Sequence, residues 1–287
     1  MTVNSYLTNL ANASIIRDQE KAGIQRSINT ISERLRRHFG GDINRSVIFG
    51  SYSRGTILPR HMDQRSDIDY MVVFAESNHQ PQTYLNRLRR FVETYYARSE
   101  IAQSNPTIVL SLNHIRFELV PAIDDWFNGL RIPAKASSFS NWIDTDPTAF
   151  NQELINKNQS HYNLIKPLVR IMKYWNAQNR YPYDSYELEQ LIVGHGYWFS
   201  ILSANTQIKD YFFADDEIKA GCGCPSQAAR GRSQVPRATR LCRIGRTGNS
   251  TFTATTWSIR IGCGHDEIYM PFQRKIAFRD PGAGAAR

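Results

Sequence analysis

The sequence predicts an α+β protein whose first half mixes strands with helices and whose second half is helical. Short apolar runs of strand length alternate with amphipathic stretches up to about residue 125, whereas residues 148–206 show helical spacing throughout. Apolar residues make up 41% of the 287 residues and charged residues 21%, as is ordinary for a globular chain. This composition argues against a disordered, collagen-like or coiled-coil protein.

The first half begins with an amphipathic helix in which isoleucine and leucine recur at helical spacing from Ile24 to Leu35, before a stop at Gly40. Short apolar runs indicate the strands, and a turn at Asn113-His114 separates the last two. After the first helix we expect a strand at 47–49, a buried strand at 68–74, a helix at 83–98 and strands at 107–112 and 115–120.

In the second half, an apolar stripe from Leu164 to Met172 predicts one helix, and Asp184 followed by Glu187 has the spacing of a capped start for another. Prolines, serines and aspartates in the stretch before it indicate a connection. We therefore expect four parts, at residues 1–125, 126–147 (the connection), 148–219 (helical) and 220–287 (a tail).

The tail differs in composition from the rest of the chain. It holds ten arginines and one lysine against three acidic residues, which is +8 of the net charge of +9. All four cysteines lie there too, at spacings that do not match a zinc ribbon. We expect a disordered basic extension or a segment that is not native to the domain, and any contact with nucleic acid would use this tail alone.

Membrane and secretory signals are not recognisable in the sequence. No apolar stretch approaches the roughly 20 residues that a membrane helix needs. The first residues lack a basic segment followed by an apolar one, as a secretory signal would have. We therefore expect a cytoplasmic protein without a membrane partner.

The candidate chemistry begins at the turn Gly50-Ser51-Tyr52-Ser53-Arg54-Gly55-Thr56, directly after an expected strand. A glycine at such a turn lets the backbone approach a phosphate, whose oxygens the exposed amides and the Ser51 hydroxyl can contact. Many strand-to-helix turns use Gly-Ser for purely structural reasons, so this turn alone does not identify a site.

Two carboxylates follow at Asp67 and Asp69, where the next strand begins. Side chains alternate across a strand, so these two share one face while Ile68 packs on the other. Carboxylates about 7 Å apart repel each other at neutral pH, and a cation between them, for which magnesium is suited, removes that penalty. A solvated strand edge is the alternative interpretation.

A third carboxylate, Glu118, lies between Phe117 and Leu119 and so faces away from the apolar side of its strand. A neighbouring strand can bring Glu118 beside Asp67 and Asp69. Three converging carboxylates are what two divalent cations need to support an in-line phosphoryl displacement on a nucleoside triphosphate. The ordered combination of turn, aspartate pair and glutamate is more specific than any one of the three.

These motifs, in this order, resemble those of the polymerase-β-type nucleotidyltransferases. The pattern G-S-x-x-x-G-T, then S-D-I-D, then F-E-L-V-P-A is similar to bacterial CD-NTases, relatives of animal cyclic GMP-AMP synthase and oligoadenylate synthases. In the helical half, residues 168–175 resemble the family's lysine-bearing helix and residues 185–189 its S-Y-x-L-E element. The resemblance covers roughly residues 20–205, and G-S-Y-S-R-G-T with D-Y-M-V-V-F leans towards the clade named CdnE.

The resemblance implies a polymerase-β-like nucleotidyltransferase lobe, a mixed sheet with helices, at 1–125 and an oligoadenylate-synthase-like helical lobe at 148–219. It implies that Asp67, Asp69 and Glu118 hold two Mg²⁺ ions, which Mn²⁺ can replace, with Glu118 on the acceptor side. Glu118 stands where many relatives have Asp, and nothing after residue 220 resembles the helices with which members usually end.

The same resemblance implies a donor-nucleotide site. Gly50 and Ser51 would hold the triphosphate, assisted by Lys173 and Ser185, and Tyr186 would stack on the donor base. A lysine supplies a compact charge for a triphosphate, and a serine at a helix start adds a hydroxyl near free amides. From the residues alone, Lys173 can also be a solvated helix residue and Tyr186 a core aromatic.

The activity implied by the resemblance is magnesium-dependent condensation of ribonucleoside triphosphates into a cyclic di- or trinucleotide. Such products are second messengers in bacterial anti-phage signalling of the CBASS type, and a downstream effector would bind the product rather than this chain. Two alternatives stay open. One is nucleotidyl transfer to a linear oligonucleotide, RNA, small-molecule or protein acceptor; the other is an inactive nucleic-acid-binding protein that uses its basic tail.

Overall fold

The structure is a computed structural model, and its description of the chain covers two separate units. It describes residues 2–104, 106–125, 129–134, 141–198, 205–215 and 218, together with the backbone of 255–260 and 269–274. Residues 2–216 form one compact unit, and residues 217–287 belong to another. In the part of the chain so described, no helix is both long and apolar enough to cross a membrane.

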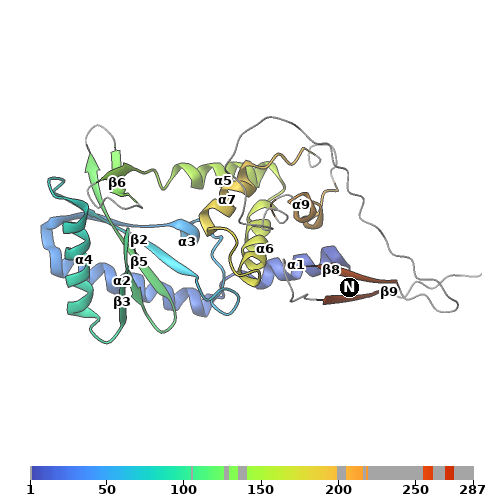
Figure 1. Cartoon of the computed structure of the whole chain (residues 1–287), viewed down its shortest axis with the longest axis horizontal. Helices are drawn as coiled ribbons and strands as arrows, with labels where there is room; N and C mark the ends of the chain where they lie inside the picture. Colours follow the sequence, from blue (N-terminus) through green and yellow to red (C-terminus); the bar gives the residue numbers. More distant parts are fainter. Residues whose placement is uncertain are drawn as a thin grey trace, which may run out of the picture. The chain divides into compact units, whose positions relative to one another are not determined.

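The first unit contains a sheet, the helices that cover it and a group of further helices (Figure 1). Its elements are α1 (Val3–Ala13), α2 (Asp18–Phe39), η1 (Gly40–Asp42), β1 (Ile43–Phe49), α3 (Gly50–Arg54), β2 (Asp67–Phe74), α4 (Pro81–Tyr95), β3 (Glu100–Ser104), β4 (Thr107–Ser111), β5 (Arg116–Asp125), β6 (Gly129–Pro133), β7 (Trp142–Asp144), α5 (Ala149–Ser160), α6 (Ile165–Gln178), α7 (Ser185–Gly194) and α9 (Ile208–Ala214). In the second unit, β8 (Thr255–Arg260) pairs with β9 (Tyr269–Arg274) in antiparallel fashion.

The sheet of the first unit is mixed, with strand order β1-β2-β5-β4-β3. Strand β2 runs antiparallel to β1 but parallel to β5, and β4 and β3 continue from β5 as antiparallel neighbours. Strands β6 and β7 extend from the far end of β5. This mixed sheet with helices confirms the predicted α+β fold class.

The two faces of the sheet bury different apolar sets. On one face, Ile68, Tyr70 and their alternate neighbours in β2 pack with apolar residues of α2 and α4 to form the main core. On the other face, Met71 and Val73 pack with Ala122 of β5. Because side chains alternate along a strand, Asp67 and Asp69 at the start of β2 lie on the face opposite the main core.

Most expected elements are present, with shifted ends. Helix α2 begins six residues before the first apolar position of the predicted stripe, at Asp18, and β5 continues through Pro121 instead of ending at Val120. Gly40 ends α2 with φ +53°, in keeping with the predicted stop. The expected turn at Asn113-His114 separates β4 from β5.

Three regions contain elements that the sequence patterns did not indicate. Residues 126–147, predicted to be a connection, contain the strands β6 and β7, and Leu130 and Ile132 of β6 pack on the second face of the sheet. Helix α1, which was not predicted, is capped by Thr2 and packs against α6 and α9 of the helical half. In the tail at 220–287, the described residues form the β8–β9 pair, and all four cysteines lie outside the described residues.

Candidate active site

The three predicted carboxylates lie on neighbouring parallel strands and face the same side of the sheet. In the register of β2 and β5, Asp67 is opposite Arg116 and Asp69 is opposite Glu118. Phe117 belongs to the main core, so Glu118 and Arg116 point to the opposite face, which Asp67 and Asp69 share. The parallel pairing of two strands far apart in the sequence therefore brings the predicted triad together.

The Arg116 side chain connects two of these carboxylates. Its Nη2 lies 2.7 Å from Asp67 Oδ2 and 3.3 Å from Glu118 Oε1. Because both oxygens contact one nitrogen, they lie within about 6 Å of each other, a range in which charges interact strongly. The solvated-edge alternative is therefore wrong for Asp67, which has a paired and partly buried carboxylate.

Asp69 lies against the first residue of α3. Gly50 has φ +68°, and a Cβ at this position would be 1.7 Å from Asp69 Oδ2. The glycine thus admits the carboxylate as well as the left-handed backbone of the turn. The turn predicted to hold phosphate is therefore in direct contact with Asp69, one of the three predicted metal ligands.

The pKa values of two carboxyl groups reflect this crowding. Burial, followed by the neighbouring charges of Asp67 and Glu118, raises the pKa of Asp69 to about 8, although Arg54 and Lys173 act in the opposite sense. Burial and the Asp67 carboxylate also raise the pKa of Glu118, against the effect of Arg116. Negative charge is therefore poorly compensated at this place, and a bound cation would relieve the repulsion.

The donor chemistry of these residues fits a hard divalent cation such as Mg²⁺, which prefers carboxylate oxygens. Among the described residues, however, no three His, Cys, Asp or Glu side chains are grouped closely enough to form a ready metal cage. The Arg116 guanidinium already pairs with Asp67 and Glu118, so it compensates part of their negative charge in place of a metal.

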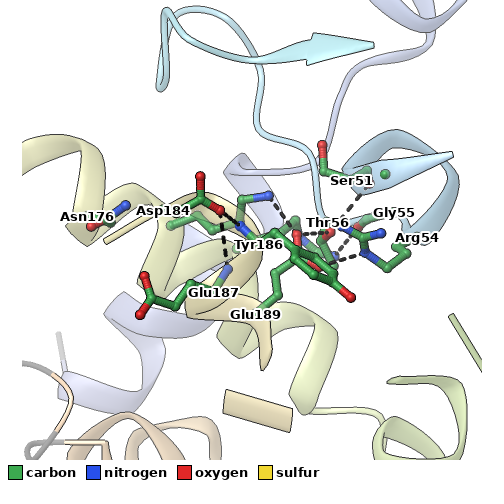
Figure 2. A network of polar contacts seen from close by, with 12 residues as sticks. Ser51, Arg54, Gly55, Thr56, Asn176, Asp184, Tyr186, Glu187 and Glu189 are labelled. Atoms are coloured by element: carbon green, nitrogen blue, oxygen red, sulfur yellow. Dashed lines mark hydrogen bonds and ion pairs between the residues drawn. The ribbon is translucent and has the colours of Figure 1, made fainter. Parts of the chain in front are cut away.

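A second cluster, buried and ionic, adjoins the turn (Figure 2). Glu189 of α7 has no exposed surface, and it accepts hydrogen bonds from Arg54 Nε (2.7 Å), Lys173 Nζ (2.8 Å) and Thr56 Oγ1 (2.9 Å). Burial alone would raise the pKa of Glu189, but the charges of Lys173 and Arg54 outweigh it and lower that pKa. Removing one partner of a buried ion pair costs about 3–5 kcal/mol, so this cluster is a major contact between α3, α6 and α7.

The predicted donor-site residues lie around this cluster. Lys173 is only 6% exposed, so it is not a solvated helix residue, and its ammonium is held by Glu189. Tyr186 is 44% exposed, so it is not a core aromatic, and its ring lies 5.6 Å from the Arg54 guanidinium. Ser185 is exposed as the first residue of α7, and Ser51 is half-buried in α3.

Sequence reasoning missed the cations and the acid that organise the site. Arg54 and Glu189 lie within the recognised motifs, and Arg116 within a predicted strand, but the sequence patterns indicate no role for any of the three. The signal available for Glu189 was a charged residue next to Leu188, on the apolar side of a helix, where burial requires a partner. The sequence does not show which cations pair with Glu189.

A further contact joins the loop before β2 to the turn before α7. Tyr181 Oη donates to Asp63 Oδ1 at 2.7 Å, and the Arg65 guanidinium lies 3.7 Å from the centre of the Tyr181 ring. Burial, followed by the hydrogen bond and charge of Asp63, raises the pKa of Tyr181 to about 12. This contact fixes the loop that leads into Asp67 against the helical half.

The described part of the chain also has an open groove that none of the predicted site residues lines. It has a volume of about 900 Å³ and runs along α2 from Gln19 to Arg34, and His61, Tyr96 and His114 also line it. The carboxylates and the buried cluster therefore form the candidate site through their contacts, separately from this groove.

Comparison with known sequences decides the family. The sequence profile of the Second Messenger Oligonucleotide or Dinucleotide Synthetase (SMODS) domain matches residues 1–158, more than half of the chain. The chain belongs to the SMODS family. The matched residues include the turn at Gly50 and all three carboxylates, so the structure shows how a SMODS chain arranges them.

Two relatives have names that describe nucleotide synthesis. A cyclic AMP-AMP-AMP synthase of Acinetobacter is 25% identical over 158 residues, which is 53% of this chain and 45% of that protein. A probable cyclic nucleotide synthase of Bacillus cereus is 24% identical over 241 residues, 68% of this chain and 71% of that protein. The chain thus matches less than half the length of the first relative and about seven-tenths of the second.

The fold is also that of a solved CD-NTase. The crystal structure of the Vibrio cholerae cyclic AMP-GMP synthase DncV, described as a prokaryotic homologue of cGAS, superimposes with a TM-score of 0.62. The match covers 76% of this chain and 78% of that chain at 11% identity. The predicted resemblance to bacterial CD-NTases is confirmed, whereas the lean towards the CdnE clade stays a prediction.

Proposed function

We infer that this SMODS chain is a magnesium-dependent nucleotidyltransferase that condenses ribonucleoside triphosphates into a cyclic di- or trinucleotide. The observation that carries the proposal is that Asp67, Asp69 and Glu118 share one sheet face, with Asp69 against the glycine of the Gly50-Ser51 turn. The names of the two relatives support a cyclic product. The proposed setting is the bacterial cytoplasm, with the product acting as an anti-phage second messenger of the CBASS type.

In this proposal, the chain's residues bind and orient two nucleotides. Asp67, Asp69 and Glu118 would hold two Mg²⁺ ions, or Mn²⁺ in their place, which would supply charge neutralisation and activation of a hydroxyl. The acceptor hydroxyl gives its proton to solvent as its oxygen forms a bond to the α-phosphorus of the donor, while the bond from that phosphorus to the leaving pyrophosphate breaks. A second transfer at the same site closes the ring.

The donor nucleotide is proposed to lie over the turn and the start of α7. Gly50 and Ser51 approach the triphosphate, and Lys173 and Ser185 contribute a charge and a hydroxyl. Tyr186 stacks on the base, which its exposed ring permits. The phosphate groups are thereby oriented toward the carboxylates, and the acceptor lies on the Glu118 side.

The test is incubation of the purified full chain with labelled ribonucleoside triphosphates and MgCl₂, followed by phosphatase treatment. We expect phosphatase-resistant products from the wild type and a loss of about 10²-fold or more in Asp69→Asn, which removes a proposed metal ligand. Asp124→Asn is the matched control, because Asp124 lies on the same strand β5 as Glu118 but pairs with Arg45 at 2.6 Å.

Each alternative product has its own signature in this assay. Phosphatase-sensitive products would favour transfer to a linear oligonucleotide or another acceptor. Absence of product with every nucleotide combination, from a cooperatively folded sample, would contradict the proposal and favour an inactive protein whose basic tail binds nucleic acid. Salt-sensitive binding of nucleic acid would then persist in Asp69→Asn.

A further inference from the structure

Glu189 is placed where three elements of the proposed donor site meet (Figure 2). Arg54 is the last residue of α3, whose first residues are Gly50 and Ser51, and Lys173 lies in α6. Glu189 itself belongs to α7, which begins at Ser185. One carboxylate therefore joins the helix of the proposed triphosphate turn, the helix of the proposed lysine and the helix that carries the proposed base-stacking tyrosine.

The geometry of this carboxylate is fully determined by its partners. Oε2 accepts from Arg54 Nε at 2.7 Å, while Oε1 accepts from Lys173 Nζ at 2.8 Å and from Thr56 Oγ1 at 2.9 Å. Both oxygens are occupied and the side chain is inaccessible to water. Charge-assisted bonds of this kind are short and strong, so they restrict the rotamers of two otherwise flexible cations.

The charges of this cluster do not balance. Arg54 and Lys173 are both cations and Glu189 is the acid that pairs with both, which leaves one positive charge beside the turn. Arg54 also lies 5.3 Å from the ring of Phe150 and 5.6 Å from the ring of Tyr186. The same guanidinium is thus fixed by Glu189 on one side and supports an exposed aromatic ring on the other.

We propose that Glu189 is a positioning residue for the donor nucleotide. It holds Lys173 and Arg54 so that their surplus positive charge faces the triphosphate, and through Arg54 it fixes the ring of Tyr186 relative to the Gly50-Ser51 turn. The inference rests on the proposed function and adds Arg54 as a second cation for the donor phosphates. Glu189 acts through these residues and does not itself touch the nucleotide.

The test is equilibrium binding of the four α,β-methylene ribonucleoside triphosphates, with MgCl₂, to the full-length chain by calorimetry. We expect Glu189→Gln to weaken binding at least about tenfold, because the amide keeps the shape but not the charge that orients both cations. Glu189→Asp keeps the carboxylate and recovers part of the affinity. Glu187→Gln, an exposed position in the same helix, binds as the wild type does.

Thr56→Val is the milder variant, and it decides the question if Glu189→Gln fails to fold. It deletes one hydrogen bond to Oε1 and keeps the shape of the side chain, so we expect about threefold weaker binding. Inorganic tripolyphosphate is the second probe. Because it has no base, its competition weakens in these variants by a similar factor if the cations are mispositioned, whereas a general loss of folded protein lowers only the number of binding sites.

The outcomes separate this inference from the proposed function. If the wild type binds no triphosphate analogue, the proposed function itself fails. If the wild type binds but folded Glu189→Gln and Thr56→Val bind triphosphates and tripolyphosphate within twofold of it, the positioning role is overturned and the proposed function stands.

Discussion

At Gly50, two separate constraints exclude any larger residue. Its φ of +68° is a conformation that side chains with a Cβ rarely adopt, and that Cβ would lie 1.7 Å from Asp69 Oδ2. Gly55, at the end of the same short helix, has φ +72° but nothing within 4 Å of its Cβ position. Substitutions at both glycines strain the backbone, but only a substitution at Gly50 also displaces the Asp69 carboxylate. Comparing the two positions therefore distinguishes the two effects.

We predict that Gly50→Ala and Gly55→Ala each lose about 1–2 kcal/mol of unfolding free energy through the left-handed backbone. Only Gly50→Ala forces Asp69 to turn away, so its turnover is expected to fall by about 10²-fold, as for a misplaced reacting group. Chemical denaturation and product formation measure the two effects. Equal turnover in the two variants would show that Asp69 does not need its observed position.

The site residues that could be predicted from the sequence are those whose position in a local pattern of polar and apolar residues fixes the face on which they lie. The alternation of Asp67, Ile68 and Asp69 at a strand start defines their shared face, and the position of Glu118 between two apolar residues does the same on β5. Arg116 occupies the same face by the same alternation, but nothing in the sequence says that its side chain bridges carboxylates instead of facing solvent. Such pairing depends on the register of β2 with β5, which only the folded sheet shows.

At the scale of elements, the contact between Tyr181 and Asp63 joins the loop before β2 to the turn before α7. Burial, followed by the hydrogen bond to Asp63 and the charge of that carboxylate, raises the pKa of Tyr181 to about 12, above the ordinary value of about 10. A group whose pKa is raised on folding stabilises the folded state fully at pH values below its unfolded pKa. That contribution is lost as the pH rises through the folded pKa.

We therefore predict that Tyr181→Phe lowers the unfolding free energy by about 1–3 kcal/mol at neutral pH, because Asp63 Oδ1 loses the phenol donor and keeps the backbone N–H of Arg65. The difference between wild type and variant is expected to stay constant up to about pH 10 and to shrink between pH 10 and about 12. Urea unfolding at several pH values measures it. A difference that does not change with pH would show that folding does not raise the pKa of Tyr181.

Elements differed in how well the sequence indicated them. The strands β2 and β5 and the helices α2 and α6 have long apolar patterns, and the patterns predict each of them with ends about six residues off at most. Strands β6 and β7 are short and lie in a stretch with Pro133 and many polar residues, so the pairing of β6 with β5 and of β7 with β6 outweighs a weak local preference. Helix α1 was missed because its burial comes from α6 and α9, which lie more than a hundred residues later.

At the scale of the whole molecule, the contacts divide the chain after Asp216, and the charge divides near the same place. The expected four-part division at 1–125, 126–147, 148–219 and 220–287 stays a prediction. Composition was enough to separate the tail, because arginine and cysteine concentrate there. The packing of α1 on the helical half was not readable, since it depends on contacts between distant segments.

We predict that a chain ending at Asp216 unfolds cooperatively, with a midpoint within a few degrees of that of the full chain, because residues 2–216 form a unit of their own. It is expected to bind triphosphate analogues as the full chain does, but to lose salt-sensitive retention on immobilised DNA, since the tail carries nearly all the surplus charge. Thermal unfolding and salt elution are the measurements. Loss of cooperative unfolding would show that the tail completes the fold.

The guanidinium of Arg116 has a thermodynamic consequence for any divalent ion that binds at Asp67 and Glu118. Such an ion competes with a monovalent group that is covalently attached and therefore present at a high and constant effective concentration. The apparent dissociation constant of the ion therefore measures how well it replaces the Arg116 guanidinium, and not how well it binds to unpaired carboxylates. An ion of low charge density gains little binding free energy when it replaces the guanidinium. Competition from Arg116 therefore favours small, doubly charged ions over sodium or potassium.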